Sequence, residues 1–402
     1  MFHILCSQFV LFEKMLAIES ITMEKREKDK LHIVMLGHKR IPSREGGIEI
    51  VVEELATRMV SQGHKVVCYN RKGHHVSGKE YDYANLKEYK GVELKTVLTI
   101  DKKGLAAMTS SFFGAVKAAW SRCDVVHFHA EGPCAVLWIP KLFGKRCIAT
   151  IHGLDHQRAK WGKFARMYIM LGERCAARYA DEIIVLSKSV QQYFRDTYGR
   201  ETVFIPNGVN RPERVDADII KAKWNLEKDN YVLYLGRVVP EKGIQYLIQA
   251  FKNISTDKKL VIAGGASDTN DFLSELQSDS VDDERIIFTG FVQGRELEAL
   301  YSNAYVYVLP SDLEGMPLSL LEAMSYGNCC LVSDIDECAE VVENRAVIFK
   351  KGNVSDLTEK LQMLCEKVEV VQEYRTPVTD FICEKYSWNE IVFKTLSLYE
   401  KA

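Results

Sequence analysis

The chain has 402 residues, which is too long for one ordinary hydrophobic core and indicates two domains. Its formal net charge of −2 argues against a protein that coats nucleic acid or gathers acidic ligands. The eleven cysteines form no CxxC pair and no paired Cys/His ligand spacing. They are typical of reduced thiols in a cytosolic protein and do not indicate a zinc site.

Residues 1–30 form an N-terminal extension whose beginning, MFHILCSQFVLFEKMLAI, is apolar. Glu13 and Lys14 interrupt this run, no small-residue cleavage site follows it, and the uninterrupted part is too short to span a bilayer. We therefore expect an amphipathic extension, with Met23 as an alternative start of the chain. No other segment approaches the length of a transmembrane helix, so we expect a cytoplasmic protein, soluble or peripheral on the inner face of the plasma membrane.

From residue 31 the sequence alternates β-rich apolar runs with amphipathic helical patterns. The first series of strands is LHIVML, KVVCY, VELKTV, DVVHF, RCIATI, EIIVL and TVFIP, with helices expected over 47–62, 104–120 and around 160–179. The second series is YVLYLG, KLVIAG, RIIFTG, AYVYVLP and CCLVS, with helices expected from 243, near 270–278, from Pro317 and over much of the chain after 354. This alternation predicts an α/β fold in which helices cover both faces of a parallel sheet.

Two such series predict two Rossmann-like, doubly wound domains that face each other across a cleft. The boundary is expected near residues 206–215, so the domains would comprise residues 31–210 and 211–380, followed by a last helical segment over 381–402. In sheets of this kind ligands bind beyond the carboxyl ends of the strands. Functional residues are therefore expected in the loops that follow the strands.

Two of these loops carry features that suit a phosphate. Gly46 and Gly47 precede the helix expected over 47–62, so their amides can approach a phosphate and the helix dipole adds to the attraction. Arg237 and Lys242 follow the first strand of the second series, where a guanidinium and an ammonium together can neutralise a diphosphate. The alternatives are a plain glycine turn and two surface cations. A GxGxxG fingerprint is absent, which argues against a dinucleotide-dependent dehydrogenase.

The run LEGMPLSLLEAMSYG, residues 313–327, places a glutamate on each side of a predicted helix start. Pro317 suits the first helical position, Glu314 precedes the helix, and Glu322 lies inside it. Free N–H groups at a helix start favour an anion, so two carboxylates beside them indicate a ligand with both phosphates and hydroxyls. Alternatively, Glu314 only complements the helix dipole and Glu322 is a solvated side chain.

Three histidines lie at strand ends that can reach the same cleft. His127 and His129 belong to one strand, and we expect only His129, the later of the two, to face the cleft, with His127 in the core. His152 follows another strand end, with Asp155 nearby. The alternative is that all three histidines are structural.

Two further patterns remain. The DxD tripeptides at 216–218 and 334–336 resemble metal sites of nucleotide-sugar enzymes, but neither has a further acidic ligand at a defined spacing, so we interpret both as non-metal. Residues 141–178 contain nine Lys and Arg residues, so this stretch would suit an anionic membrane surface. The alternative is a helix whose apolar stripe lies in the core. The apolar positions at helical spacing are Trp161, Phe164, Tyr168 and Leu171.

Five segments together are similar to one known family: REGGIE, HFHAEGP, FIPNGV, GRVVPEKGI and EGMPLSLLEAMSYG. As a set they resemble the retaining glycosyltransferases of family 4, which have the GT-B fold of two Rossmann-like domains. The resemblance covers roughly residues 31–400, and residues 1–30 depart from the family's pattern. The stretch GHKRIPSREGGIEIVVEELA is most similar to bacterial enzymes of capsular or exopolysaccharide assembly, several of them rhamnosyltransferases.

The resemblance implies a donor site in the second domain, residues 211–380, which would bind the nucleotide sugar. Glu314 would hold hydroxyls of the donor sugar, and Glu322 would bind the ribose hydroxyls. Arg237 and Lys242 would clamp the diphosphate. The residues that would meet the sugar and the diphosphate between the two glutamates are Gly315, Met316, Pro317 and Leu318.

The resemblance also implies an acceptor site in the first domain, residues 31–210. His129 would contact the transferred sugar, and Gly46 and Gly47 would lie near the phosphate and the acceptor. His152 and Asp155 are the candidates on the acceptor side. The last helix, within residues 381–402, would cross back to the first domain.

The implied function is that of a retaining, metal-independent hexosyltransferase without a cofactor. It would move a hexose-type sugar from a nucleoside-diphosphate sugar to a hydroxyl of a glycan or lipid-linked saccharide in bacterial surface polysaccharide synthesis. No residue pair is an evident nucleophile with its base, so front-side attack assisted by the leaving phosphate is expected. An anionic membrane surface is a further expected partner, and nucleic acid is not. The alternatives are a GT-B sugar-nucleotide epimerase and a catalytically silent glycosyltransferase-like scaffold protein.

Overall fold

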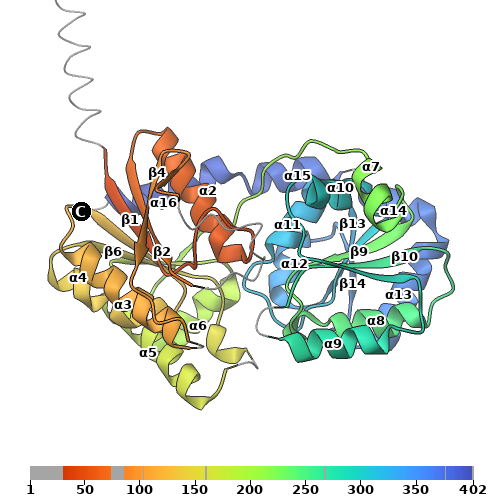
Figure 1. The fold of residues 1–402 in the computed structure, drawn as a ribbon, viewed down its shortest axis with the longest axis horizontal. Helices are drawn as coiled ribbons and strands as arrows, with labels where there is room; N and C mark the ends of the chain where they lie inside the picture. Colours follow the sequence, from red (N-terminus) through yellow and green to blue (C-terminus); the bar gives the residue numbers. More distant parts are fainter. Residues whose placement is uncertain are drawn as a thin grey trace, which may run out of the picture.

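The computed structural model describes residues 30–73, 86–102, 104–158, 161–266, 269–375 and 377–400. Apart from Lys30, the expected N-terminal extension lies outside these residues. The chain forms two α/β domains that lie side by side, each built on one twisted sheet (Figure 1). The predicted fold of two doubly wound domains is thereby confirmed.

The first domain contains an eight-stranded sheet of order β3-β4-β2-β1-β5-β6-β7-β8, in which only β3 and β4 pair antiparallel. Successive residues of β1 point to opposite faces, so Ile33 and Met35 enter one core cluster and Val34 and Leu36 another. Its strands are β1 (His32–Leu36), β2 (Lys65–Arg71), β3 (Glu88–Tyr89), β4 (Val92–Val97), β5 (Val125–His129), β6 (Arg146–Ile151), β7 (Glu182–Val185) and β8 (Val203–Phe204). Its helices are α2 (Gly47–Ser61), α3 (Leu105–Ala119), α4 (Trp138–Leu142), α5 (Lys163–Tyr179) and α6 (Lys188–Tyr198), with the 3-10 turns η2 (Gly132–Val136) and η3 (Asp155–Gln157).

The second domain contains a six-stranded parallel sheet of order β11-β10-β9-β12-β13-β14. Helices again cover both faces, and this is why its strands read as nearly unbroken apolar runs. Its strands are β9 (Tyr231–Leu235), β10 (Lys259–Ala263), β11 (Ile286–Gly290), β12 (Val306–Leu309), β13 (Cys329–Ser333) and β14 (Val347–Phe349). Its helices are α7 (Asp218–Trp224), α8 (Ile244–Lys252), α9 (Asn270–Asp279), α10 (Arg295–Asn303), α11 (Leu318–Ser325), α12 (Asp336–Val342), α13 (Val354–Glu366), α14 (Val368–Arg375) and α15 (Val378–Lys385), with the 3-10 turn η4 (Pro240–Lys242).

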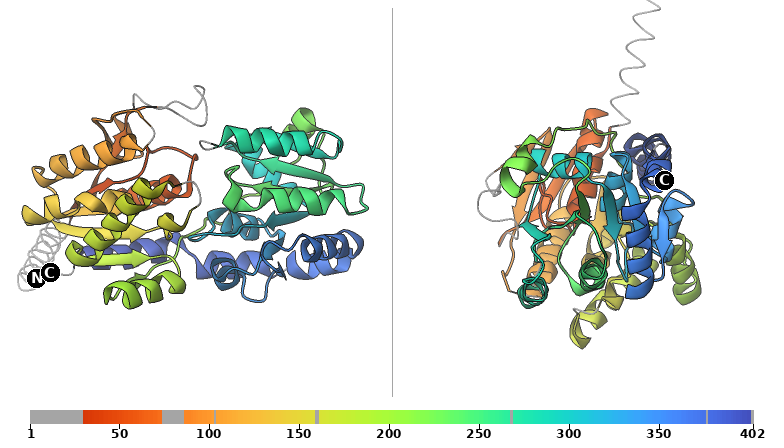
Figure 2. Two further views of the ribbon diagram at one scale, coloured as in Figure 1. Left: turned by 90° about the horizontal axis from the view of Figure 1, so that it is seen from below. Right: turned by 90° about the vertical axis from the view of Figure 1, so that its right-hand side faces the viewer.

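Two chain segments cross between the domains next to each other. Residues 205–215 lead from the first domain to the second, and the chain returns after α15, so that α16 (Trp388–Glu400) lies against the first domain (Figures 1 and 2). The Val209 N–H donates to the Tyr386 carbonyl oxygen at 2.8 Å, and the Tyr399 hydroxyl is hydrogen-bonded to His127 Nδ1 at 2.5 Å. Of the segment expected over 381–402, the part that lies against the first domain is therefore helix α16.

The helix start in the GMPLS segment differs slightly from the prediction. Pro317 is the N-cap residue, with an extended ψ of 99°, and the helix begins one residue later at Leu318. Among the described residues, no helix combines the length and the apolar character that a membrane span requires.

Candidate active site

The two domains touch at a pair of glycines. A Cβ atom added to Gly315, just before α11, would lie 1.7 Å from the carbonyl oxygen of His152, and one added to Gly153 would lie 2.9 Å from the Cα of Gly315. Neither space admits a larger residue without moving a backbone, and Gly153 also has a φ of +130°. The loop after β6 therefore packs directly on the segment that leads into α11.

Two helix N-termini meet beside this contact. Helix α2 begins at Gly47, and a Cβ atom there would lie 3.3 Å from Cδ1 of Leu318, where α11 begins. The N-cap residues Gly46 and Pro317 make no side-chain capping bond, although the buried carboxylate of Glu49 lies beside the start of α2. Because each helix carries partial positive charge at its N-terminus, the gap between them favours an anion.

Glu314 and Lys242, separated in the sequence, form an ion pair at this gap. Lys242 Nζ lies 2.5 Å from Glu314 Oε1, and the Ser311 hydroxyl donates to the same oxygen at 2.6 Å. Both charged side chains are largely buried, with 12% and 7% of their side-chain surface exposed. A tight contact positions them, because a Cβ atom on Gly243 would lie 1.9 Å from the Pro310 carbonyl oxygen.

Arg237 lies in the same loop as Lys242. Its backbone carbonyl accepts a hydrogen bond from the Tyr234 hydroxyl at 2.9 Å. Burial raises the pKa of that phenol well above its ordinary value, Glu314 raises it further, and Arg237 lowers it. Arg237 and Glu314 thus lie near the same buried tyrosine, while the Arg237 guanidinium has no hydrogen bond or ion pair with any described residue.

Glu322, inside α11, lies on the side of the gap between α2 and α11 that is away from Glu314 and Lys242. The Tyr301 hydroxyl donates to its Oε2 at 3.1 Å, and Arg44 Nη1 of the first domain donates to its Oε1 at 3.1 Å. Burial raises the pKa of Glu322, and Arg44 opposes that shift. A cavity of about 880 Å³, within the range of ligand sites, opens here between the domains. Its lining includes Arg44, Leu297, Tyr301, Glu322 and Tyr326, but not Glu314 or Lys242.

Strand alternation cannot separate His127 from His129, because residues two apart on a strand lie on the same face, so that argument for placing only His129 at the cleft is wrong. The His127 and His129 rings lie side by side with centroids 4.1 Å apart and planes tilted by 33°, and both are fully buried. His127 is a core histidine, as predicted, hydrogen-bonded to Thr150 Oγ1 at 2.7 Å, and burial lowers its pKa to about 3. His129 Nδ1 is hydrogen-bonded to His152 Nε2 at 3.2 Å.

The pair His129 and His152 lies at the glycine contact and is uncharged at neutral pH. Burial and then the neighbouring His127 and His152 lower the pKa of His129 well below its ordinary value. Burial lowers the pKa of His152 to about 4, against the opposing effect of Asp155 and Glu49. His129 Nε2 is buried without a hydrogen-bond partner among the described residues.

Asp155 does not stand free on the acceptor side. Its carboxylate is paired with Arg158, whose Nε lies 2.7 Å from Oδ1. Arg158 also reaches across to the second domain, with Nη1 3.5 Å from Glu241 Oε1. Arg158 is one of the nine Lys and Arg residues of 141–178, but only 15% of its side chain is exposed, so it does not belong to a basic outer surface.

Arg44 and Arg158 both contact the second domain, and neither was predicted from the sequence as a cleft residue. Arg44 directly precedes the glutamate and glycines of REGGIE, and Arg158 follows Asp155 at the i, i+3 spacing of a pairing partner. These neighbours in the sequence were the only signals that the two arginines could be functional. Their partners, Glu322 and Glu241, follow only from the packing of one domain on the other.

Helix α5 shows where the apolar side chains of the 141–178 stretch lie. Its inner face is formed by small and apolar residues such as Ile169, Gly172 and Ala176. Phe164 and Leu171, which an ordinary helix would place in the core, are 71% and 49% exposed. The apolar stripe is therefore not simply a core-facing stripe.

Comparison with known proteins agrees with this geometry. Residues 45–212 match the family model "Glycosyltransferase Family 4", and residues 216–376 match "Glycosyl transferases group 1". An uncharacterized glycosyltransferase of Methanocaldococcus jannaschii is 26% identical, over 92% of this chain and 98% of its own. The N,N'-diacetylbacillosaminyl-diphospho-undecaprenol alpha-1,3-N-acetylgalactosaminyltransferase of Campylobacter jejuni is 24% identical, over 90% of this chain and 93% of its own. The crystal structure of HepE from Anabaena in complex with UDP-glucose has the same fold, with a TM-score of 0.76 at 16% identity, covering 91% of this chain and 99% of that one.

Proposed function

Given that the chain belongs to glycosyltransferase family 4 and has the GT-B fold, we propose that its cleft transfers a hexose-type sugar from a nucleoside-diphosphate sugar. The acceptor is a hydroxyl of a glycan or lipid-linked saccharide in the synthesis of a bacterial surface polysaccharide. The observation that carries this proposal is the gap where the starts of α2 and α11 meet, flanked by the Lys242–Glu314 pair and by Glu322. Helix starts and a cation suit a diphosphate, and carboxylates suit sugar hydroxyls.

In this proposal the two glutamates have different ligands. Glu322 borders the 880 Å³ cavity and accepts hydrogen bonds from the ribose, in place of Arg44. Glu314 lies at the enclosed end and accepts hydrogen bonds from the donor sugar, while Lys242 turns to the diphosphate. Arg237, whose guanidinium has no described partner, is the second cation for the phosphates.

The reaction proceeds with retention and without a metal ion. The bond between the anomeric carbon and the diphosphate oxygen breaks, and the acceptor oxygen bonds to that carbon from the same face. The acceptor proton passes to the leaving diphosphate oxygen, whose charge the helix starts, Arg237 and Lys242 stabilise. His129 and His152, both uncharged near neutral pH, contact the sugar as hydrogen-bonding groups rather than as a general acid.

The names of two relatives support a lipid-linked acceptor. The Campylobacter jejuni relative is named for a diphospho-undecaprenol substrate, and so is an Escherichia coli galactosyltransferase that is 29% identical over 55% of this chain. Such acceptors lie in a bilayer, so a lipid-linked acceptor would be met at a membrane surface.

The binding half of the proposal is tested by thermal shift with UDP-, GDP- and dTDP-sugars. A ligand that binds only the folded protein raises its unfolding free energy, by about 2.7 kcal/mol at a concentration 100 times its Kd. We expect one nucleotide series to raise the melting temperature and free sugars to have no effect. Absence of a shift with every nucleotide sugar at millimolar concentration would contradict the proposal.

Replacing Glu322 by glutamine should weaken binding of the bare nucleoside diphosphate about tenfold, as measured by calorimetry. A carboxylate accepts charge-assisted hydrogen bonds from two ribose hydroxyls, and the neutral amide offers one acceptor oxygen, a difference of about 1.4 kcal/mol. Glu359→Gln, an exposed change on α13, is the matched control. An unchanged Kd in Glu322→Gln would remove Glu322 from the ribose site.

We further propose that α3, α4 and α5 rest on an anionic membrane on the inner face of the plasma membrane. These helices are neighbours in the first domain (Figure 1), and the rings of Trp120 and Phe143 lie 6.5 Å apart. Large apolar side chains project from this surface, and exposed cations accompany them. The exposed apolar residues are Phe112, Phe113, Trp120, Trp138, Leu142, Phe143, Phe164, Met167 and Leu171. The exposed cations on α5 include Lys163, Arg166 and Arg174.

The double change Trp120→Ser and Phe143→Ser should lower binding to vesicles that contain phosphatidylglycerol by about tenfold or more, because both rings would leave the acyl boundary. Sedimentation of the protein with vesicles measures this, and raised salt should weaken the wild type as well. Val281→Ser removes an even more exposed apolar side chain from the second domain and should leave binding unchanged. Equal binding of both variants would show that this face does not contact the membrane.

A further inference from the structure

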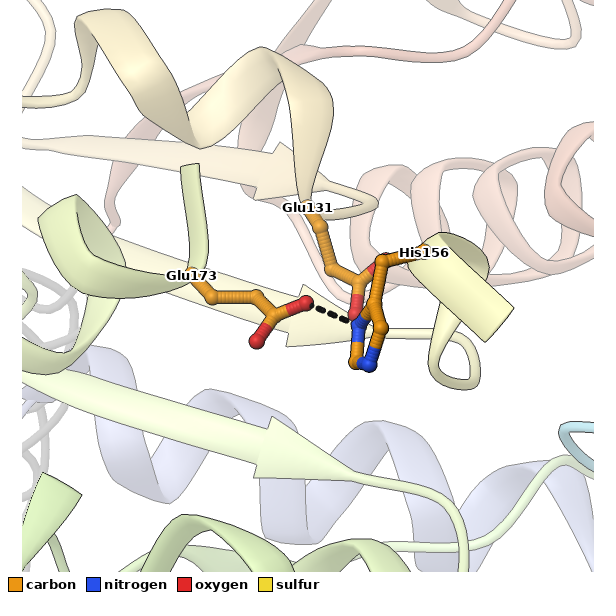
Figure 3. A group of neighbouring side chains, drawn as sticks. All are labelled: Glu131, His156 and Glu173. Carbon is orange, nitrogen blue, oxygen red and sulfur yellow. Dashed lines mark hydrogen bonds and ion pairs between the residues drawn. The ribbon is translucent and has the colours of Figure 1, made fainter. Parts of the chain in front are cut away.

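A buried group of three ligating side chains lies under the acceptor-side loops of the first domain. Glu131 follows β5, His156 lies in η3, and Glu173 lies in α5. One oxygen or nitrogen atom from each lies within 4.8 Å of the other two. The carboxylates of both glutamates point toward the imidazole of His156 (Figure 3).

Close packing of α5 on the loop after β5 brings the two glutamates together. A Cβ atom added to Gly172 would lie 1.9 Å from the Glu131 carbonyl oxygen, so only a glycine lets the helix approach so closely. Glu131 and Glu173 are both fully buried. Two carboxylates without exposure carry a large desolvation cost unless positive charge or protons compensate it.

Part of this charge is compensated by hydrogen bonds. Glu173 Oε1 is hydrogen-bonded to His156 Nδ1 at 2.6 Å, and Glu173 Oε2 accepts from the hydroxyls of Tyr193 and Tyr198, each at 2.9 Å. Glu131 Oε2 accepts from the Asp155 N–H at 2.7 Å. Glu131 Oε1, however, is buried with no partner among the described residues.

We propose that Glu131, His156 and Glu173 bind one divalent transition-metal ion, for which Zn²⁺ is the reference probe. Imidazole and carboxylate are ligands that such ions share, and the ion neutralises the two buried carboxylates. Glu131 Oε1 can bind the ion without breaking a hydrogen bond, because it has none with the described residues. The side chain of His156 is 18% exposed, which leaves a path for the ion and for a water ligand.

Hydrogen bonds from neighbouring groups hold the two glutamates in place, as such bonds commonly do for metal ligands. The two tyrosine hydroxyls hold Glu173, and the backbone N–H of Asp155 holds Glu131. Burial, and then Asp155 and Glu173, raise the pKa of Glu131 well above its ordinary value, so a proton on Glu131 is the alternative to the metal.

The ion would be structural, not catalytic. Glu131 is two residues after His129, and His156 is three residues after Gly153, which contacts Gly315. An ion bound by both loops and by Glu173 would hold the acceptor side of the cleft against α5. The diphosphate would still be bound by Lys242 and Arg237. Metal binding therefore raises the stability of the first domain without being required by the transfer step.

The test loads the full-length, metal-stripped protein with Zn²⁺, Mn²⁺ or Ca²⁺ and measures the bound metal by mass spectrometry after gel filtration. We expect one Zn²⁺ per chain and a melting temperature that rises with Zn²⁺ but not with Ca²⁺. His156→Gln should weaken Zn²⁺ binding by at least tenfold, and Tyr193→Phe by about tenfold, as expected for a residue that orients a ligand. His64→Gln, on a partly exposed histidine outside the group, should bind like the wild type.

Two results would overturn this inference. One is Zn²⁺ retention by the wild type no greater than that of His156→Gln, with both proteins folded by circular dichroism. The other is a metal-free Glu131→Gln variant that is as stable as the Zn²⁺-treated wild type. An uncharged amide would then suit the site as well as the ion does, so that a proton on Glu131, and not a metal, would be what neutralises the buried pair. Nucleotide-sugar binding measured on the same samples is independent of both results, so failure here leaves the proposed transferase function in place.

Discussion

Replacing Glu314 by glutamine should lower the rate of sugar transfer about 10²-fold or more while leaving nucleoside-diphosphate binding within about threefold. The change removes a buried, charged acceptor of sugar hydroxyls and leaves Lys242 without its partner. The sugar is therefore held less well when its bond to the phosphate breaks. Single-turnover transfer measures the rate, and calorimetry with the bare nucleotide measures the binding.

The contrast with Glu322 makes this prediction specific. Glu322→Gln should weaken nucleotide binding, and Glu314→Gln should slow the transfer. Glu314 precedes α11 and Glu322 lies inside it, and the two carboxylates contact different groups. Glu359→Gln should change neither quantity. If Glu314→Gln transfers sugar at a near-normal rate, the enclosed end of the cleft does not hold the donor sugar.

Replacing Gly315 by alanine should lower kcat/KM by about 10²-fold with little change in the melting temperature of either domain. The new methyl group would lie 1.7 Å from the His152 carbonyl oxygen, and the strain is relieved by moving the domains apart rather than by unfolding. A displacement of about 1 Å in a catalytic arrangement costs rate on this scale. Small-angle X-ray scattering should show a larger radius of gyration for the variant.

Gly162→Ala is the control, because a Cβ atom there meets nothing within 4 Å. It should have the scattering curve and the activity of the wild type. A Gly315→Ala protein with full activity and an unchanged radius of gyration would mean that the contact with His152 is not made during catalysis.

Much of the fold could be predicted from the sequence because periodicity is local. The helices expected over 47–62, 104–120 and 270–278 end within one residue of α2, α3 and α9, since each combines an apolar stripe with clear flanking strands. Helices α6 and α10 were not predicted, although each is amphipathic and buries an apolar face, with Val190 and Phe194 in α6 and Leu300 in α10. The preference of proline for the first helical position predicted a helix start at Pro317, and the helix begins one residue later, at Leu318.

The site could be predicted only in part, for a different reason. Glu314, Lys242 and Gly47 were identified by their loops, and the structure brings their neighbourhoods together. His127 and His129 lie on the same face of β5, as their spacing of two residues requires, so the alternation of the strand could not assign them to different environments. The bonds of Arg44 and Arg158 to the second domain depend on domain docking, and no pattern within either half of the chain encodes it.

The proposed activity of the cleft between the domains is transfer of a sugar from a nucleotide to an acceptor hydroxyl. The most direct measurement is incubation with the nucleotide sugar that gives the largest thermal shift and with lipid-linked saccharides, followed by NMR of the product. We expect a new glycosidic bond with the anomeric configuration of the donor, formed only when the acceptor is present. Isomerisation of the nucleotide sugar without acceptor, or no turnover of any bound donor, would contradict it.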